Sequence, residues 1–139
     1  KGESDRALIN GMGGTINYQD ASWQGFEAED LIAIIDLGSA KTINSVEVRF
    51  LQSQVFWIFL PYHVQIEHSA DGKNFELIYE DYPSNDFSFE QKIISYKANI
   101  DPLESRFIRV KGYNIDQCPD YHPGAGGPSW IFSDEIIIN

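Results

Sequence analysis

The sequence has little cysteine and no long apolar stretch. Its single cysteine, Cys118, excludes an internal disulfide and leaves the redox compartment open. No apolar run approaches the roughly 20 residues that a membrane-spanning helix needs. The sequence shows no signal peptide, but it opens at Lys1 without a methionine. We therefore expect a piece of a longer protein, from its C-terminal part.

Basic residues are also scarce. The chain carries 10 Lys and Arg residues against 21 Asp and Glu residues, a formal net charge of -11. Phosphate groups attract basic surfaces, so this balance disfavours nucleic acid and anionic lipid as partners. The same balance favours divalent cations and does not bear on neutral sugars.

The chain also lacks a recognisable catalytic arrangement. No Ser/His/Asp order and no phosphate-binding loop stands out. Acidic residues come as adjacent pairs at 29–30, 80–81 and 134–135. Adjacent side chains on a strand point to opposite faces, which does not suit paired acid and base catalysis. Cys118 with His122 supplies only two possible zinc ligands or an unsupported nucleophile pair, so we expect a non-enzyme with an inert thiol.

The residues that are present predict a β protein. With 139 residues, 42% hydrophobic and 14% aromatic, the chain can bury one substantial core, and we expect a single domain over residues 1–139. Short apolar or alternating segments predict strands, and Asp71-Gly72 predicts a tight hairpin turn. The expected strands cover residues 31–36, 45–51, 62–69, 75–79, 92–98, 106–111 and 130–138. This spacing is typical of an all-β antiparallel β-sandwich or jelly roll.

Four long irregular segments separate these strands. They cover residues 16–30, 52–61, 81–91 and 114–129. Loops of this length inside a compact domain are usually functional, because ordering them costs entropy that packing must offset. Three of the four, 16–30, 52–61 and 114–129, carry aromatic residues that we expect to be exposed, and these could form a sugar-binding surface.

The two ends of the chain carry matching oxygen ligands. A glycine-rich loop, Ala7–Thr15, has oxygen donors at short spacing, and the last strand begins with Asp134-Glu135. Such ends meet when a sheet closes on its own first strand. The pairing would form a small cage of hard oxygen ligands, which suits calcium. In the alternative interpretation, Asn10-Gly11 is only a turn and Glu135 only a solvated strand residue.

Several of these segments, taken in order, resemble the discoidin domain, also called the coagulation factor V/VIII type C domain. Its bacterial branch overlaps the family 32 carbohydrate-binding modules. The matching segments are residues 7–15, 35–38, 69–75, 106–110 and 134–136, and they span nearly the whole chain. The tail Cys118–Trp130 looks like the C-terminal modules of bacterial β-hexosaminidases, which are chitobiase-like enzymes. The resemblance implies a galactose-binding-like jelly roll and a non-catalytic module that targets a secreted glycoside hydrolase to glycans. It also implies a bacterial protein that is secreted, periplasmic or on the cell surface.

The resemblance further implies a structural calcium site. Its ligands would be the side chains of Asn10 and Glu135, the hydroxyl and carbonyl of Thr15, and the carbonyls of Ala7, Met12 and Asp134. The family usually has an aspartate where this chain has Asn10. Losing that charge should weaken calcium binding, and a monovalent ion is the alternative occupant.

A sugar site in the resembling modules lies on loops at one end of the sandwich. Platform and polar candidates for this chain are Trp23, Gln24, Trp57, His63, Asp120, Tyr121 and His122. Trp57 lies in a run apolar enough to be core, Trp23 could cap the sandwich, and His63 could be an interior histidine. The expected partner is a galactose-type or N-acetylhexosamine-type glycan.

Two other functions remain open. The module could instead pack on the parent catalytic domain without binding sugar. A membrane-lipid binder ranks last, because residues 52–61 and 114–129 contain no Lys or Arg.

Overall fold

The computed structural model describes Gln19 and residues 23–85 and 89–139, which form one antiparallel sheet of six strands that folds over on itself. The sheet order is β1-β6-β2-β5-β3-β4. The elements are β1 (Gln24–Glu27), β2 (Leu31–Gln52), the 3-10 helix η2 (Gln54–Phe56), β3 (His63–Ser69), β4 (Glu76–Asp81), β5 (Lys92–Tyr113) and β6 (Trp130–Ile138). Within this part of the chain no helix is long and apolar enough to cross a membrane.

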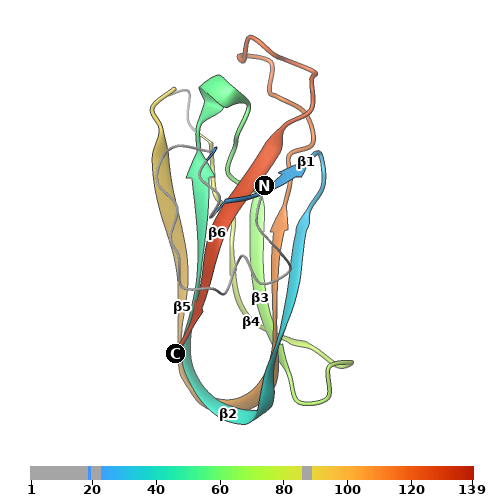
Figure 1. Cartoon of the computed structure of the whole chain (residues 1–139), viewed down its shortest axis with the longest axis vertical. Coiled ribbons are helices and arrows are strands. Elements are labelled where there is room, and N and C mark those ends of the chain that lie inside the picture. The colour runs from blue at the N-terminus through green and yellow to red at the C-terminus, as the bar shows by residue number, and fades with distance from the viewer. Residues whose placement is uncertain (1–18, 20–22, 86–88) are drawn as a thin grey trace.

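Two strands are much longer than the sequence predicts. The segments expected at 31–36 and 45–51 are both parts of β2, and those at 92–98 and 106–111 are both parts of β5. The two strands pair along their whole length, with register shifts between Asp36 and Lys41 and between Ile43 and Ser45. Figure 1 shows them turning together at the lower end, so each strand contributes to both layers of the sandwich. The segment 16–30, expected to be irregular, contains β1, which pairs with β6.

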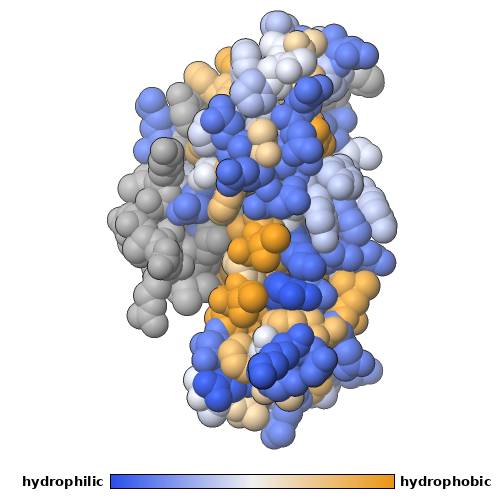
Figure 2. All heavy atoms as spheres, turned by 90° about the vertical axis from the view of Figure 1, so that its right-hand side faces the viewer, coloured by the Kyte–Doolittle hydropathy of each residue, from blue (hydrophilic) through white to orange (hydrophobic). Residues whose placement is uncertain are grey.

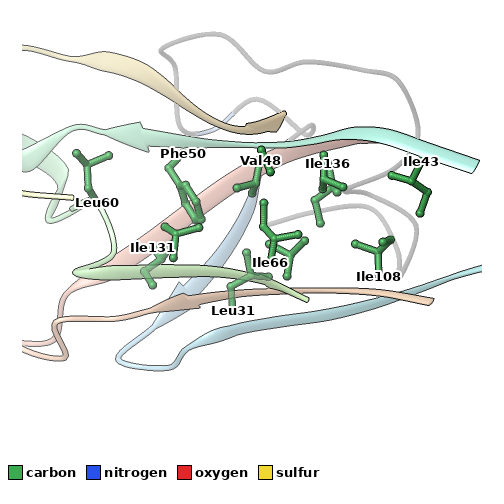
Figure 3. Packing of buried hydrophobic residues seen from close by; sticks show 13 residues of the cluster. Leu31, Ile43, Val48, Phe50, Leu60, Ile66, Ile108, Ile131 and Ile136 are labelled. Carbon is green, nitrogen blue, oxygen red and sulfur yellow. The ribbon is translucent and has the colours of Figure 1, made fainter. Parts of the chain in front are cut away.

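The core lies between the two layers. Val46, Val48 and Phe50 alternate along β2 and are completely buried, as the period of two predicts. They meet Val64 and Ile66 of β3, which are also completely buried. Figure 3 shows Val48 and Phe50 on one layer and Ile66 on the other, with their side chains in the space between the layers. The alternation expected for both strands is therefore confirmed.

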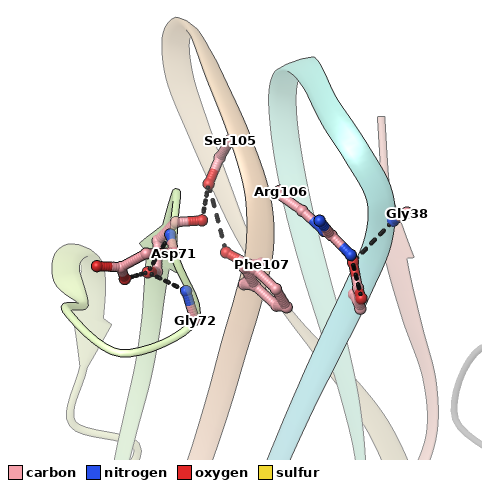
Figure 4. Close-up of polar contacts among 8 residues, drawn as sticks. Gly38, Asp71, Gly72, Ser105, Arg106 and Phe107 are labelled. Atoms are coloured by element: carbon pink, nitrogen blue, oxygen red, sulfur yellow. Dashed lines mark hydrogen bonds and ion pairs between the residues drawn. The ribbon is translucent and has the colours of Figure 1, made fainter.

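The end with the bent strands is held by short polar contacts (Figure 4). The expected Asp71-Gly72 turn is present, with Gly72 at φ +77° and the Asp71 carboxylate accepting the N–H groups that follow it. Arg106 donates two hydrogen bonds to Asp36 at 2.8 and 3.0 Å. These bonds, with one from the Gly38 N–H, lower the pKa of Asp36 to about 2. The polar side chains Asp36, Asp71 and Arg106 at this end therefore already have hydrogen-bond partners.

The connections after β1, β2, β4 and β5 gather at the opposite end of the sandwich, the upper end in Figure 1. The side of the molecule that carries the first part of β2 also shows two exposed isoleucines, Ile32 and Ile34, which are 60% and 56% exposed. In Figure 2 hydrophobic spheres gather in the middle of this side, with hydrophilic residues around them. The chain therefore offers two kinds of surface to partners: a loop end and an outer sheet face.

Candidate functional site

Trp57 lies at the loop end in an unusual backbone conformation. It directly follows η2 and has φ 65° and ψ 27°, in the left-handed region. Bulky residues rarely adopt this conformation, which costs on the order of 1–3 kcal/mol and persists only where the surroundings hold it. Two backbone hydrogen bonds hold it here: the Trp57 N–H donates to the Gln54 carbonyl, and the Trp57 carbonyl accepts from the Trp130 N–H. The position of the Trp57 ring is thus set by the fold.

The Trp57 ring lies on two glycines of the 114–129 loop. A Cβ added to Gly124 would lie 2.5 Å from Cζ2 of Trp57, and one added to Gly127 would lie 2.6 Å from Cζ3. Non-bonded carbon atoms essentially never come this close, so only glycine allows this approach. Even with this support the Trp57 side chain remains 37% exposed. Trp57 is therefore both packed and accessible.

His122 joins the same loop to the β2–β3 connection through a hydrogen bond. Its Nε2 lies 2.6 Å from the Gln54 carbonyl, which can only accept, and its Nδ1 lies 2.9 Å from the Gly124 N–H, which can only donate. The ring is therefore neutral, with its proton on Nε2. It is 4% exposed and meets the Trp57 ring edge-on at 6.0 Å between centroids. The expected role of His122 in binding sugar hydroxyls is wrong, because both ring nitrogens are already used.

Exposed apolar side chains surround Trp57. We call Val55, Phe56, Trp57 and Phe89 the Trp57 surface; they come from the β2–β3 and β4–β5 connections and are between 37% and 54% exposed. The Phe89 ring stacks on His122 at 5.7 Å. The other polar candidates of the 114–129 loop directly precede His122: Asp120 is exposed, and the Tyr121 hydroxyl donates to the Gln54 side chain at 2.8 Å.

Trp23 and Gln24 do not belong to this surface. Trp23 is completely buried in a second core cluster with Leu51, Ile58 and Phe132. Its expected role as a sugar platform is therefore wrong, because a buried ring offers no face to a ligand. Gln24 is half-buried opposite Ser133 on β6, and its side-chain oxygen is inaccessible to solvent.

His63 lies elsewhere, on the outer face of the sheet. Val64 points into the core, so its neighbour His63 points outward. The His63 ring is stacked between Tyr82, at 4.2 Å and 14°, and Tyr113, at 5.1 Å and 24°. We call these three residues the tyrosine–histidine row. Tyr62 lies beside the row, 5.9 Å from Tyr113.

The sequence analysis missed the tyrosines of this row. The alternation of strand residues could have indicated them. It places His63 on the outward face of the strand expected at 62–69, and Tyr82 follows the next expected strand. However, only the pairing of β3 with β4 and β5 brings the rings together. The row is thus a product of strand register.

A carboxylate sits next to the row. Glu80 accepts a hydrogen bond from His63 Nε2 at 2.8 Å, and this bond holds the pKa of Glu80 below its usual value. Further along the same face, Arg109 makes a bidentate ion pair with Glu67, and Lys111 also pairs with Glu67 at 3.4 Å. The cations of this face are therefore used by Glu67 and not by Glu80.

The expected metal ligands Asp134 and Glu135 lie at a β-bulge. Val48 pairs with Ile136, but Phe50 pairs with Ser133, so two residues of β6 stand opposite Arg49 alone. Both carboxylates are buried, at 0% and 6% exposed. The Asp134 carboxylate forms an ion pair with Arg49 at 3.0 Å.

The expected roles of these two residues in a calcium site stay a prediction. Arg49 pairs with Oδ2 of Asp134, and the resemblance implies that Asp134 contributes its carbonyl as a ligand. The Glu135 side chain, the expected carboxylate ligand, is buried. The other expected ligands, Ala7, Asn10, Met12 and Thr15, lie outside the described residues. Within the described ranges no group of three or more His, Cys, Asp or Glu side chains could hold a metal ion.

Cys118 shows no sign of reactivity. It is 3% exposed, and burial raises the pKa of its thiol. Its sulfur lies 3.9 Å from the Pro128 carbonyl. Both ring nitrogens of His122 are engaged elsewhere, so the histidine cannot serve as a base for this thiol.

Comparisons with known proteins identify the fold. No protein-family model and no curated protein matches the chain. A chitosan-binding module of a chitosanase/glucanase from Paenibacillus sp. IK-5 has a TM-score of 0.64 and 14% identity over 98% of this chain and 84% of that chain. The CBM32 of AlyQ, solved with 4,5-unsaturated mannuronic acid, has a TM-score of 0.55 and 18% identity over 97% and 84%. The C-terminal domain of a chitobiase from Bacteroides fragilis has a TM-score of 0.52 and 18% identity over 96% and 78%.

These matches confirm the expected all-β jelly roll and the resemblance in fold to family 32 carbohydrate-binding modules. The matched structures of this fold are modules or domains of larger enzymes, and two of the three are named for carbohydrate binding rather than catalysis. The chain spans only 21% of the length of a matching Ruminococcus gnavus fucosidase. At identities below 20%, the likeness extends to the fold and not to the ligand.

Proposed function

We propose that this chain is a non-catalytic carbohydrate-binding module, and that the Trp57 surface is its sugar site. The observation that supports this proposal most is an exposed tryptophan, held at the loop end by a left-handed backbone and by two glycines. Sugars present flat C–H faces, and sites for them combine an aromatic platform with a few fixed polar groups. Asp120, exposed in the adjacent loop, is the polar candidate.

Rigidity makes Trp57 suitable for this role. A side chain that is ordered before binding loses little conformational entropy when the ligand arrives. The Trp57 backbone is fixed by hydrogen bonds, and its ring by Gly124, Gly127 and His122. We infer that the module is part of an extracellular bacterial glycoside hydrolase and binds glycans ending in galactose or an N-acetylhexosamine.

A glycan array followed by calorimetric titration tests this proposal. The wild-type domain should bind a subset of glycans, and Trp57→Ala should weaken that binding about tenfold or more, as expected for a central aromatic residue of a site. Phe56→Ala is a second variant, useful if Trp57→Ala unfolds. Leu77→Ala removes a 48% exposed side chain on β4 and should leave the affinity unchanged.

Equal binding by the wild type and a folded Trp57→Ala variant would refute the site. A folded domain that binds no glycan would support the alternative function, a module that packs on its catalytic domain. Ile32 and Ile34 favour this alternative, since both are large apolar side chains exposed on the first part of β2. In that case the full-length protein should protect both residues from solvent.

We also propose that calcium, or a monovalent ion in its place, ties the first loop to the last strand. The support is the β-bulge that places Asp134 and Glu135 together in the last strand, with both side chains buried. The ion would supply positive charge to buried oxygen atoms, and its role would be structural.

A further inference from the structure

The tyrosine–histidine row leaves one aromatic face open. Tyr82 is 63% exposed, although His63 covers one face of its ring at 4.2 Å. The other face must therefore provide much of the exposed area. β4 is the outer strand of the sheet order, so no described strand lies beyond this ring.

Charge near this ring is negative. Glu80 is 39% exposed at its side chain and lies on the outer face, whereas the exposed Asp81 pairs with the core residue Val64 and so points to the other face. Among the described residues neither carboxylate pairs with a lysine or arginine, because Arg109 and Lys111 both pair with Glu67. The chain as a whole carries a formal net charge of -11.

We propose that Tyr82, Glu80 and His63 form a second binding site, on the outer sheet face, for a sugar with a free, protonated amine. The open Tyr82 face would take the apolar face of the sugar ring and attract the ammonium group through the ring quadrupole. Glu80 would accept from the ammonium. The site shares no residue with the Trp57 surface. It would distinguish sugars by the charge of their amine, whereas the Trp57 surface would distinguish them by shape.

Glu80 can accept this donor without losing its present partners. Its Oε1 accepts from His63 Nε2 at 2.8 Å and from the Tyr82 hydroxyl at 3.4 Å, and the Gln65 side chain also bonds to Glu80. An ionised carboxylate has about four acceptor positions, so it retains capacity. A neutral sugar gains nothing from this charge, and a sulfated or acidic sugar would be repelled by it.

His63 acts as a positioning residue. Its ring lies between Tyr82 and Tyr113, and its Nε2 hydrogen bond orients Glu80. The two groups that would contact the ligand are thus arranged before it arrives, which lowers the entropic cost of binding.

Titration of the isotope-labelled domain with a glucosamine tetramer, followed by NMR, tests the proposal. Backbone signals of residues 63–65 and 79–82 should shift and saturate, while the fully N-acetylated tetramer should leave them in place. Glu80→Gln and Tyr82→Ala should each weaken binding about two- to fivefold. Added salt should weaken it as well, because the attraction is electrostatic.

Matched variants separate this site from the Trp57 surface. Tyr82→Phe keeps the ring and should bind like the wild type, and Trp57→Ala should not alter the shifts of the row. Glu80→Gln still accepts from His63, so the row should remain intact and only the charge is lost. The proposal is overturned if the acetylated tetramer shifts the row equally, if neither tetramer does, or if Glu80→Gln binds the amine as tightly as the wild type.

Discussion

At the scale of single residues, the burial and the hydrogen bonding of Trp23, Trp57 and His122 do not follow from their residue types alone. Trp23 is completely buried and Trp57 is 37% exposed, although the sequence offered both as platforms. His122 is neutral and bonded at both nitrogens. The difference comes from what each ring meets: a core cluster for Trp23, and glycines for Trp57.

The packing of Trp57 gives a prediction for Gly124. In Gly124→Ala the new methyl group would overlap the Trp57 ring at 2.5 Å, so either the ring or the loop must move. We expect a loss of about 1–3 kcal/mol in the free energy of unfolding and a red-shifted, more exposed tryptophan fluorescence. Urea denaturation followed by fluorescence measures both.

Gly126→Ala is the control for this change. Nothing lies within 4 Å of a Cβ at Gly126, but its φ is +83°. The control should show a backbone cost of about 1 kcal/mol without a change in the native fluorescence. Unchanged stability and fluorescence in Gly124→Ala would contradict the described packing.

At the scale of elements, one buried asparagine joins the 114–129 loop to the turn between β1 and β2. Asn114 is 2% exposed. Its amide group donates to the carbonyls of Phe26, Glu29 and Ser129, and its oxygen accepts from the Asp116 N–H and the Ser129 hydroxyl. The base of the loop that supports Trp57 therefore depends on a single side chain.

Asn114→Ala should remove all of these bonds together. Buried groups left without partners cost about 1–3 kcal/mol each, and relaxation recovers part, so we expect a loss of about 2–4 kcal/mol in unfolding free energy. Chemical denaturation measures this loss. Asn99→Ala, which changes an exposed asparagine of β5, should cost less than about 0.5 kcal/mol. Similar losses in the two variants would show that the Asn114 network does not stabilise the loop.

Another element-scale feature is the β-bulge of β6. It places Asp134 and Glu135 together opposite Arg49, where a regular strand would alternate them between faces. The sequence analysis judged adjacent carboxylates on a strand unsuited to paired acid and base catalysis for that reason. The bulge does not create a catalytic pair, since the Asp134 carboxylate forms an ion pair with Arg49.

At the scale of the whole molecule, the proposed ion would join the two ends of the chain. Its removal by a chelator should lower the melting temperature, because an ion that binds only the folded state stabilises it by mass action. Calorimetry with and without added calcium measures the shift. A chelator that does not bind calcium, used at the same concentration, is the control for ionic strength.

Glu135→Gln provides the matched variant. It should melt lower than the wild type in calcium and show little further change with chelator. An unchanged melting temperature after verified metal removal would refute the structural ion. Asp134 should not be used for this purpose, because its substitution would also leave Arg49 without its partner.

The sequence by itself determined the all-β class, the inward faces of the strands and the Asp71-Gly72 turn. These depend on a period of two and on local backbone preferences, which neighbouring residues express directly. The order of segments also indicated the discoidin-like fold. The local pattern did not reveal that β2 and β5 each run unbroken through both layers, because the bends carry few buried residues.

Only the tertiary structure decided which side chains are available to a ligand. Trp57 meets Gly124 and Gly127 from more than 60 positions away, and Tyr82 and Tyr113 reach His63 from two neighbouring strands. Such contacts depend on strand register and loop path, which no short segment encodes by itself. Exposure, ring stacking and the protonation of His122 are therefore properties of the folded chain, while the residues able to acquire them were visible in its sequence.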